Sequence, residues 1–98
     1  MPDEPPDAIE ARLRRELEGA GYDVTRYVYP PGTHFPPHTH AVDKIDAVVS
    51  GTFEIVLEGT RHVLGPGEAL PVPRGAVHEA RVLGDAPVVS LDAVRRRP

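Results

Sequence analysis

The chain has 98 residues, of which 40% are hydrophobic and 27% are charged, and its formal net charge is −4. This length predicts a single domain, and the mildly acidic balance gives no electrostatic argument for binding nucleic acid or anionic membrane. The absence of cysteine excludes disulfides, thiolate metal sites and a catalytic thiol. No apolar run approaches the roughly 20 residues of a membrane helix, and the first residues do not resemble a signal peptide. We therefore expect a soluble, cytoplasmic protein.

Residues 1–21 are predicted to form a polar lead-in followed by one amphipathic helix. Apolar residues recur every four positions among charged neighbours, which places a single apolar stripe on a helix. This stripe consists of Ile9, Leu13 and Leu17. We expect Asp3 or Asp7 to cap the helix and Gly19 or Gly21 to end it. The stripe is expected to pack on a sheet or on a partner subunit.

From Tyr22 onward the hydrophobic period changes to two, and prolines and glycines divide the chain into short segments. Such alternation between turn residues predicts strands. The predicted strands cover residues 22–29, 34–39, 44–50, 53–58, 61–64, 69–73, 78–83 and 88–94. Short strands at this spacing predict an all-β antiparallel sandwich or barrel over residues 22–94, followed by a basic tail at 95–98.

Three histidines are candidate metal ligands. His38 and His40 are separated by one residue, so an extended strand would place both side chains on one face, about 7 Å apart. His78 comes from a strand much later in the sequence. Neutral imidazole suits Zn, Fe, Ni, Cu or Mn without selecting among them. The pattern predicts a divalent metal ion at these residues, with a barrel that no longer binds metal as the alternative. His34 is expected at the rim.

Two linked motifs resemble those of the cupin family. The first runs Gly32, five residues, His38, one residue, His40, three residues, Lys44, six residues, Gly51. The second runs Gly67, five residues, Pro73, one residue, Gly75, two residues, His78, and it follows the first after fifteen residues. The resemblance implies a cupin double-stranded β-helix, a jelly-roll barrel, over residues 22–94 with the short helix before it. It also implies a homodimer and a metal held by His38, His40 and His78.

The chain departs from the cupin pattern where Lys44 occupies the position of a glutamate ligand. An ammonium beside a divalent ion is unfavourable and offers no lone pair. Three interpretations remain open. Lys44 pairs with Asp46 or Asp43; or one of these aspartates supplies the missing oxygen; or the centre has three histidines only, as in cupins of the thiol dioxygenase type. The last position of the second motif also departs, because Val82 replaces asparagine.

These features predict a metal-binding cupin, most directly a mononuclear enzyme of oxygenase or isomerase type that acts on a small anionic molecule. Lys44 is expected to anchor a carboxylate and Asp46 to act as base or ligand, with a purely structural ion pair as the alternative. Tyr27 and Phe35 are candidates for the cavity wall. The alternative functions are a non-catalytic module that binds or senses a small ligand and a structural dimerisation unit. No nucleic-acid motif is recognised.

Overall fold

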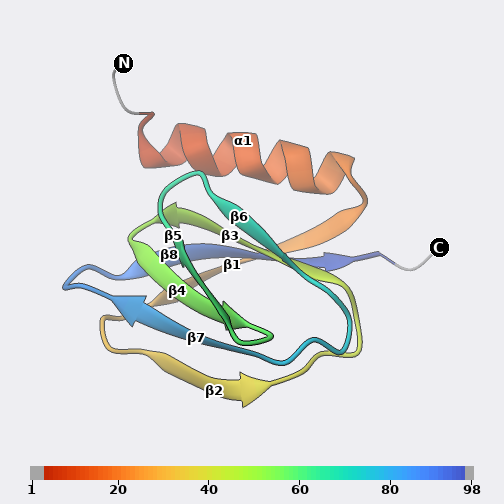
Figure 1. Cartoon of the computed structure of the whole chain (residues 1–98). Coiled ribbons are helices and arrows are strands. Elements are labelled where there is room, and N and C mark those ends of the chain that lie inside the picture. Colours follow the sequence, from red (N-terminus) through yellow and green to blue (C-terminus); the bar gives the residue numbers. More distant parts are fainter. Residues whose placement is uncertain (1–3, 97–98) are drawn as a thin grey trace.

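The computed structural model describes residues 4–96, which form one helix and eight strands in two four-stranded sheets (Figure 1). The elements are α1 (Pro6–Gly19), β1 (Tyr22–Tyr29), β2 (His34–His38), β3 (Lys44–Ser50), β4 (Thr52–Leu57), β5 (Thr60–Leu64), β6 (Ala69–Val72), β7 (His78–Leu83) and β8 (Val88–Arg95). Each predicted strand is present, with bounds that differ by no more than one residue at either end. No helix within the described range is long and apolar enough to cross a membrane.

Both sheets combine strands that are far apart in the sequence. One sheet has the order β1-β8-β3-β6 and the other the order β2-β7-β4-β5, with antiparallel pairing throughout. Apolar side chains from the two sheets pack against each other, and Val48, Ile55 and Val88 in this cluster are fully buried. The predicted all-β jelly roll is therefore confirmed.

Helix α1 covers the outer face of the β1-β8-β3-β6 sheet (Figure 1). The predicted apolar stripe of Ile9, Leu13 and Leu17 is buried and belongs to the same cluster as Leu91 and Ala93 of β8. The stripe thus packs on the sheet, which is one of the two predicted partners. Because α1 and β8 share this cluster, the helix stabilises the strand that carries Asp92, discussed below.

The start of α1 differs from the prediction. Pro5 is the N-cap residue, and no side chain caps the helix with a hydrogen bond. Pro6 occupies the first helical position, where a backbone N–H would have no partner within the helix, so its absence costs nothing. Asp7 consequently lies inside the first turn rather than at the cap, and Asp3 lies outside the described residues. The last helical residue is Gly19, and Gly21, which follows the C-cap residue Ala20, has a positive φ of 96°, so both glycines proposed to end the helix lie at its C-terminus.

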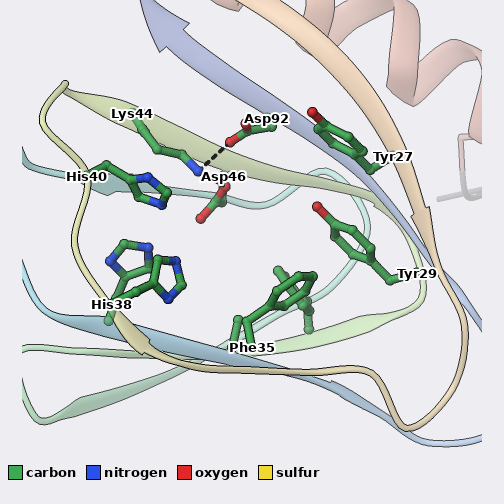
Figure 2. Close-up of a pocket in the computed structure, with 11 residues that line it drawn as sticks. Tyr27, Tyr29, Phe35, His38, His40, Lys44, Asp46 and Asp92 are labelled. Carbon is green, nitrogen blue, oxygen red and sulfur yellow. Dashed lines mark ion pairs between the residues drawn. The ribbon is translucent and has the colours of Figure 1, made fainter.

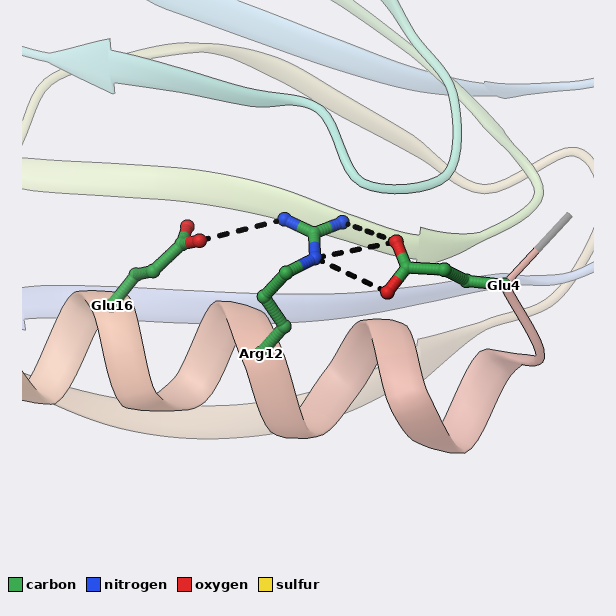
Figure 3. A network of polar contacts seen from close by, with 3 residues as sticks. All are labelled: Glu4, Arg12 and Glu16. Carbon is green, nitrogen blue, oxygen red and sulfur yellow. Dashed lines mark hydrogen bonds and ion pairs between the residues drawn. The ribbon is translucent and has the colours of Figure 1, made fainter. Parts of the chain in front are cut away.

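An exposed group of charges connects the lead-in to the helix (Figure 3). Arg12 donates a hydrogen bond of 2.9 Å to Glu4 and lies 3.6 Å from the carboxylate of Glu16. The hydrogen bond to Arg12 lowers the pKa of Glu4, and the same bond raises the pKa of Arg12. Because all three groups are open to solvent, this network directs the chain ahead of α1 but contributes little to stability.

Candidate metal centre

Three imidazole rings converge at one end of the space between the sheets. His38, the last residue of β2, pairs with His78, the first residue of β7, and the centroids of their rings are 4.2 Å apart. The ring of His40 lies 4.8 Å from that of His38 and 5.0 Å from that of His78. One nitrogen from each ring lies within 4.8 Å of the other two. Three ligand atoms so placed can surround one ion.

The position of His38 depends on an irregularity in β2. The pairing between β2 and β7 shifts register between Phe35 and His38, where the chain contains Pro36 and Pro37. Proline has no N–H to donate to a ladder, which accounts for the shift at these residues. β2 is an edge strand with a register shift at these residues, and edges and bulges are among the places in a sheet where proline is tolerated.

His40 lies beyond β2, so the prediction that it shares a strand with His38 is wrong. It lies in the connection to β3, which is fixed by two hydrogen bonds from the turn before β7. The N–H of Gly75 donates to the His40 carbonyl at 2.9 Å, and the N–H of Arg74 donates to the Asp43 carboxylate at 2.9 Å. The turn of the second motif therefore positions the loop of the first.

Hydrogen bonds fix the protonation of two rings. The Nδ1 atom of His38 lies 2.7 Å from the carbonyl oxygen of Pro36, and that of His78 lies 3.1 Å from the carbonyl oxygen of Ala76. A carbonyl oxygen only accepts, so each Nδ1 carries the proton and each Nε2 keeps its lone pair when the ring is neutral. This arrangement orients histidines as metal ligands in other proteins.

The third ring has an unsatisfied atom. The Nε2 atom of His40 is buried and has no hydrogen-bond partner within residues 4–96. Buried polar atoms without partners are rare, because a polar atom that loses its hydrogen bonds to water and gains none in the protein costs free energy. An ion coordinated at this nitrogen would satisfy it, so the residues present fit a metal ion.

The surroundings of His40 and His78 favour the neutral form of their rings. Burial lowers the pKa of His40, and the nearby charge of Lys44 lowers it further. Burial also lowers the pKa of His78, although its hydrogen bond to the Ala76 carbonyl opposes this. Neutral imidazole is the form that binds metal ions.

Lys44 begins β3 and points toward two carboxylates (Figure 2). Its Nζ atom lies 2.6 Å from Asp92 Oδ1 and 3.6 Å from Asp46 Oδ1. Asp46 and Asp92 are direct partners in the register of β3 and β8. Two carboxylates opposite each other repel, and the ammonium between them offsets that repulsion. Lys44 thus pairs with Asp46, as one interpretation predicted, and with a second carboxylate that was not predicted.

These charges shift each other's protonation. Burial raises the pKa of Asp46 to about 6, because the attraction of Lys44 does not fully compensate for burial and for the charge of Asp92. Burial opposes the charged form of Lys44, but the two carboxylates outweigh this effect and raise its pKa. Lys44 therefore stays charged at neutral pH.

Sequence reasoning did not single out Asp92. A signal was present, because Asp92 is the one charged residue in the stretch from Val88 to Val94. Asp92 lies two residues after Ser90 and four after Val88, and every second residue of a strand points to the same face. Val88 packs between the sheets and Ser90 is 1% exposed, so this face points inward.

A cavity of about 310 Å³ extends from the histidines between the sheets. The histidines, Lys44 and the two aspartates form its polar part, and aromatic rings line the remainder (Figure 2). The aromatic residues are Tyr27, Tyr29, Phe35 and Phe53. Tyr27 and Phe35 thus line the wall, as predicted. Burial raises the pKa of Tyr29 to about 12, so its hydroxyl stays protonated at neutral pH.

Two other predicted candidates lie outside this group. His34 is exposed on β2 and its Nε2 atom lies 3.3 Å from the Glu79 carboxylate, which agrees with its predicted place outside the metal site. The carboxylate of Asp43 is engaged by the backbone of Arg74, and Asp43 does not line the cavity.

The Cupin_2 family, described as a cupin domain, matches residues 25–94, and the chain belongs to this family. A search of curated proteins found no match.

Solved structures support the same assignment. KdgF from Halomonas sp. is 33% identical with a TM-score of 0.63, over 76% of this chain and 71% of that one. TT1209 from Thermus thermophilus is 29% identical with a TM-score of 0.67, over 79% of this chain and 72% of that one. The DMSP lyase DddQ from Ruegeria pomeroyi is 28% identical with a TM-score of 0.69, over 78% of this chain but 39% of that one.

Proposed function

We propose that the chain is a mononuclear metal-dependent enzyme in which His38, His40 and His78 hold one divalent ion of Fe, Mn, Ni, Zn or Cu. The observation that carries this proposal is the convergence of the three rings. In His38 and His78 the Nδ1 atom is bonded to a backbone carbonyl, which leaves the lone pair of Nε2 for an ion. In His40 the Nε2 atom is buried and has no partner among the described residues. Such an ion supplies a Lewis-acid or redox centre beside the cavity.

The proposed substrate is a small molecule with an anionic oxygen at one end and an apolar body. Three neutral imidazoles leave the charge of a divalent ion uncompensated, which favours an anionic oxygen at this end of the cavity. The rings of Tyr29, Phe35 and Phe53 form a packed aromatic wall farther in, with Tyr29 centred 4.9 Å from Phe35 and 5.7 Å from Phe53. This wall suits the apolar part of the substrate.

Asp46 favours the isomerase type over the oxygenase type. Its carboxyl is buried in the wall of the cavity, and its pKa is raised to about 6. A carboxyl group with a pKa near the working pH can accept a proton and return it within one reaction. Lys44 lies beside Asp46 and has further N–H bonds with which to hold a substrate oxygen.

The metal site is tested by elemental analysis of the purified, untagged protein after reconstitution with each candidate ion. We expect about one ion per chain in the wild type and a strong loss in His38→Ala and His78→Ala. His34→Ala is the matched control, because it removes an exposed histidine from the same strand as His38. Unchanged metal content in both cluster variants, or no ion bound by the wild type, would overturn the assignment.

The role of Asp46 is tested by exchange of substrate protons with solvent. A panel of 2-oxo and 2-hydroxy acids is incubated with metal-loaded protein in D₂O, and deuterium incorporation is followed by NMR. We expect Asp46→Asn to slow exchange about 10²- to 10⁴-fold while its metal content stays unchanged. Equal exchange by the variant and the wild type would exclude Asp46 as the base. Metal-bound protein that exchanges no member of the panel would favour the oxygenase type or a binding module.

A further inference from the structure

Lys44 places a positive charge at a position where the cupin pattern has a negatively charged ligand. Its side chain is only 10% exposed, so its charge cannot move freely into solvent. The ammonium also acts on the cluster, because Lys44 lines the same cavity as the three histidines. A positive charge beside these rings disfavours a divalent ion at their nitrogens.

The strongest restraint on this ammonium comes from β8. Asp92 Oδ1 forms a close ion pair with Lys44 Nζ at 2.6 Å, whereas Asp46 Oδ1 lies 3.6 Å away. The side chain of Asp92 is 21% exposed, so the pair is shielded from most of the solvent. Asp92 itself is held in place by β8, which pairs with strands on both sides.

We propose that Asp92 is a positioning residue for the metal centre: its carboxylate holds the Lys44 ammonium against β8 and keeps it out of the fourth-ligand position. This inference rests on the proposed three-histidine site. It explains how the lysine substitution is compatible with metal binding, because the added positive charge is neutralised locally. Asp46 has a different role. Its carboxylate lies farther from Lys44 Nζ, at 3.6 Å, and remains available to a molecule in the cavity.

The experiment is a double-mutant cycle of metal affinity. Zn²⁺ or Mn²⁺ is titrated into the wild type, Asp92→Asn, Lys44→Met and the double variant, in competition with a chromophoric chelator. We expect Asp92→Asn to weaken binding about 10- to 100-fold, as the loss of an outer-sphere partner commonly does. When Lys44 is already methionine, the same change should alter affinity less than about threefold, since only direct attraction between Asp92 and the ion is then lost.

A second readout needs no metal. Lys44 is the only lysine in the sequence, so isotope-labelled lysine gives a single side-chain signal by NMR. We expect Asp92→Asn to lower the pKa of Lys44 in the metal-free protein, because the nearer of its two carboxylate partners is removed. Asp85→Asn, which removes the same charge from the exposed turn before β8, should change neither the affinity nor this pKa. Circular dichroism verifies that each variant is folded.

The outcomes separate the two proposals. If the wild type binds no metal, the three-histidine site fails and the role of Asp92 fails with it, whatever the NMR signal shows. If the wild type binds metal but Asp92→Asn weakens binding equally in both backgrounds, the site stands and Asp92 does not act through Lys44. An unchanged Lys44 pKa in Asp92→Asn would also overturn the positioning role.

Discussion

Replacing Asp46 with asparagine should change how the stability of the metal-free protein depends on pH. Folding moves this carboxyl from water to a buried site facing Asp92, and its pKa rises from the ordinary value of 3.8 to about 6. Between these two values the folded state binds more protons than the unfolded state. The free energy of unfolding must therefore fall as the pH rises through this interval.

The size of the effect follows from the two pKa values. Their separation is about 2 pH units, each equivalent to about 1.4 kcal/mol, so ionisation of Asp46 should cost about 3 kcal/mol of stability between pH 4 and pH 7. An asparagine does not titrate, so the unfolding free energy of the variant does not fall in this way as the pH rises. Lys44 stays charged throughout the interval, and its altered contact adds only a constant offset. Relative to the wild type, the variant should gain about 3 kcal/mol as the pH rises.

The assay is urea unfolding of both proteins at a series of pH values, followed by circular dichroism because the chain has no tryptophan. The informative quantity is the difference in unfolding free energy between variant and wild type, since the titration of other groups cancels in it. Asp85→Asn serves as the control and should show no comparable trend, because its carboxylate is exposed. A difference for Asp46→Asn that is flat, or that decreases as the pH rises, would show that folding does not raise the pKa of Asp46.

Four further results are expected. Gly51→Ala should destabilise the fold by about 2–5 kcal/mol in urea unfolding, since a Cβ there would lie 2.5 Å from the Pro87 carbonyl oxygen at a φ of +87°. Leu13→Ala should cost about 2–5 kcal/mol because it empties space between α1 and the sheet, whereas Arg15→Ala on the exposed face should cost little. Lys44→Glu should tighten metal binding in the chelator titration, yet lower the stability of the metal-free protein because three carboxylates would then adjoin; unchanged affinity would show that this position cannot reach the ion. The homodimer stays a prediction, and light scattering should give twice the mass of one chain.

The strands could be predicted because the signals that define them are local. Alternation of apolar and polar residues requires only a few neighbours, and glycine or proline marks most of the turns. Likewise, the burial of Leu13 on α1 follows from a spacing of four residues. The histidine cluster could be anticipated because two of its members are close in sequence and the family motif names the third.

Features that depend on pairing between distant segments could not be predicted in the same way. The partnership of Lys44 and Asp92 depends on the register between β3 and β8, and nothing local fixes that register. The place of His40 depends on hydrogen bonds from the turn that contains Gly75, which follows 35 residues later. In addition, the two prolines shift the register between β2 and β7 just before His38, and β2 ends at His38, so His40 lies outside the strand.

The prolines of β2 also bear on how the molecule behaves at high concentration. An outer strand normally presents a row of unpaired N–H and C=O groups, onto which a strand of another molecule can add and begin aggregation. Pro36 and Pro37 interrupt that row on β2, the outer strand nearest the histidines, because neither has an N–H to offer. The two residues that bring His38 into position thereby also protect this edge of the sheet against growth into an intermolecular sheet.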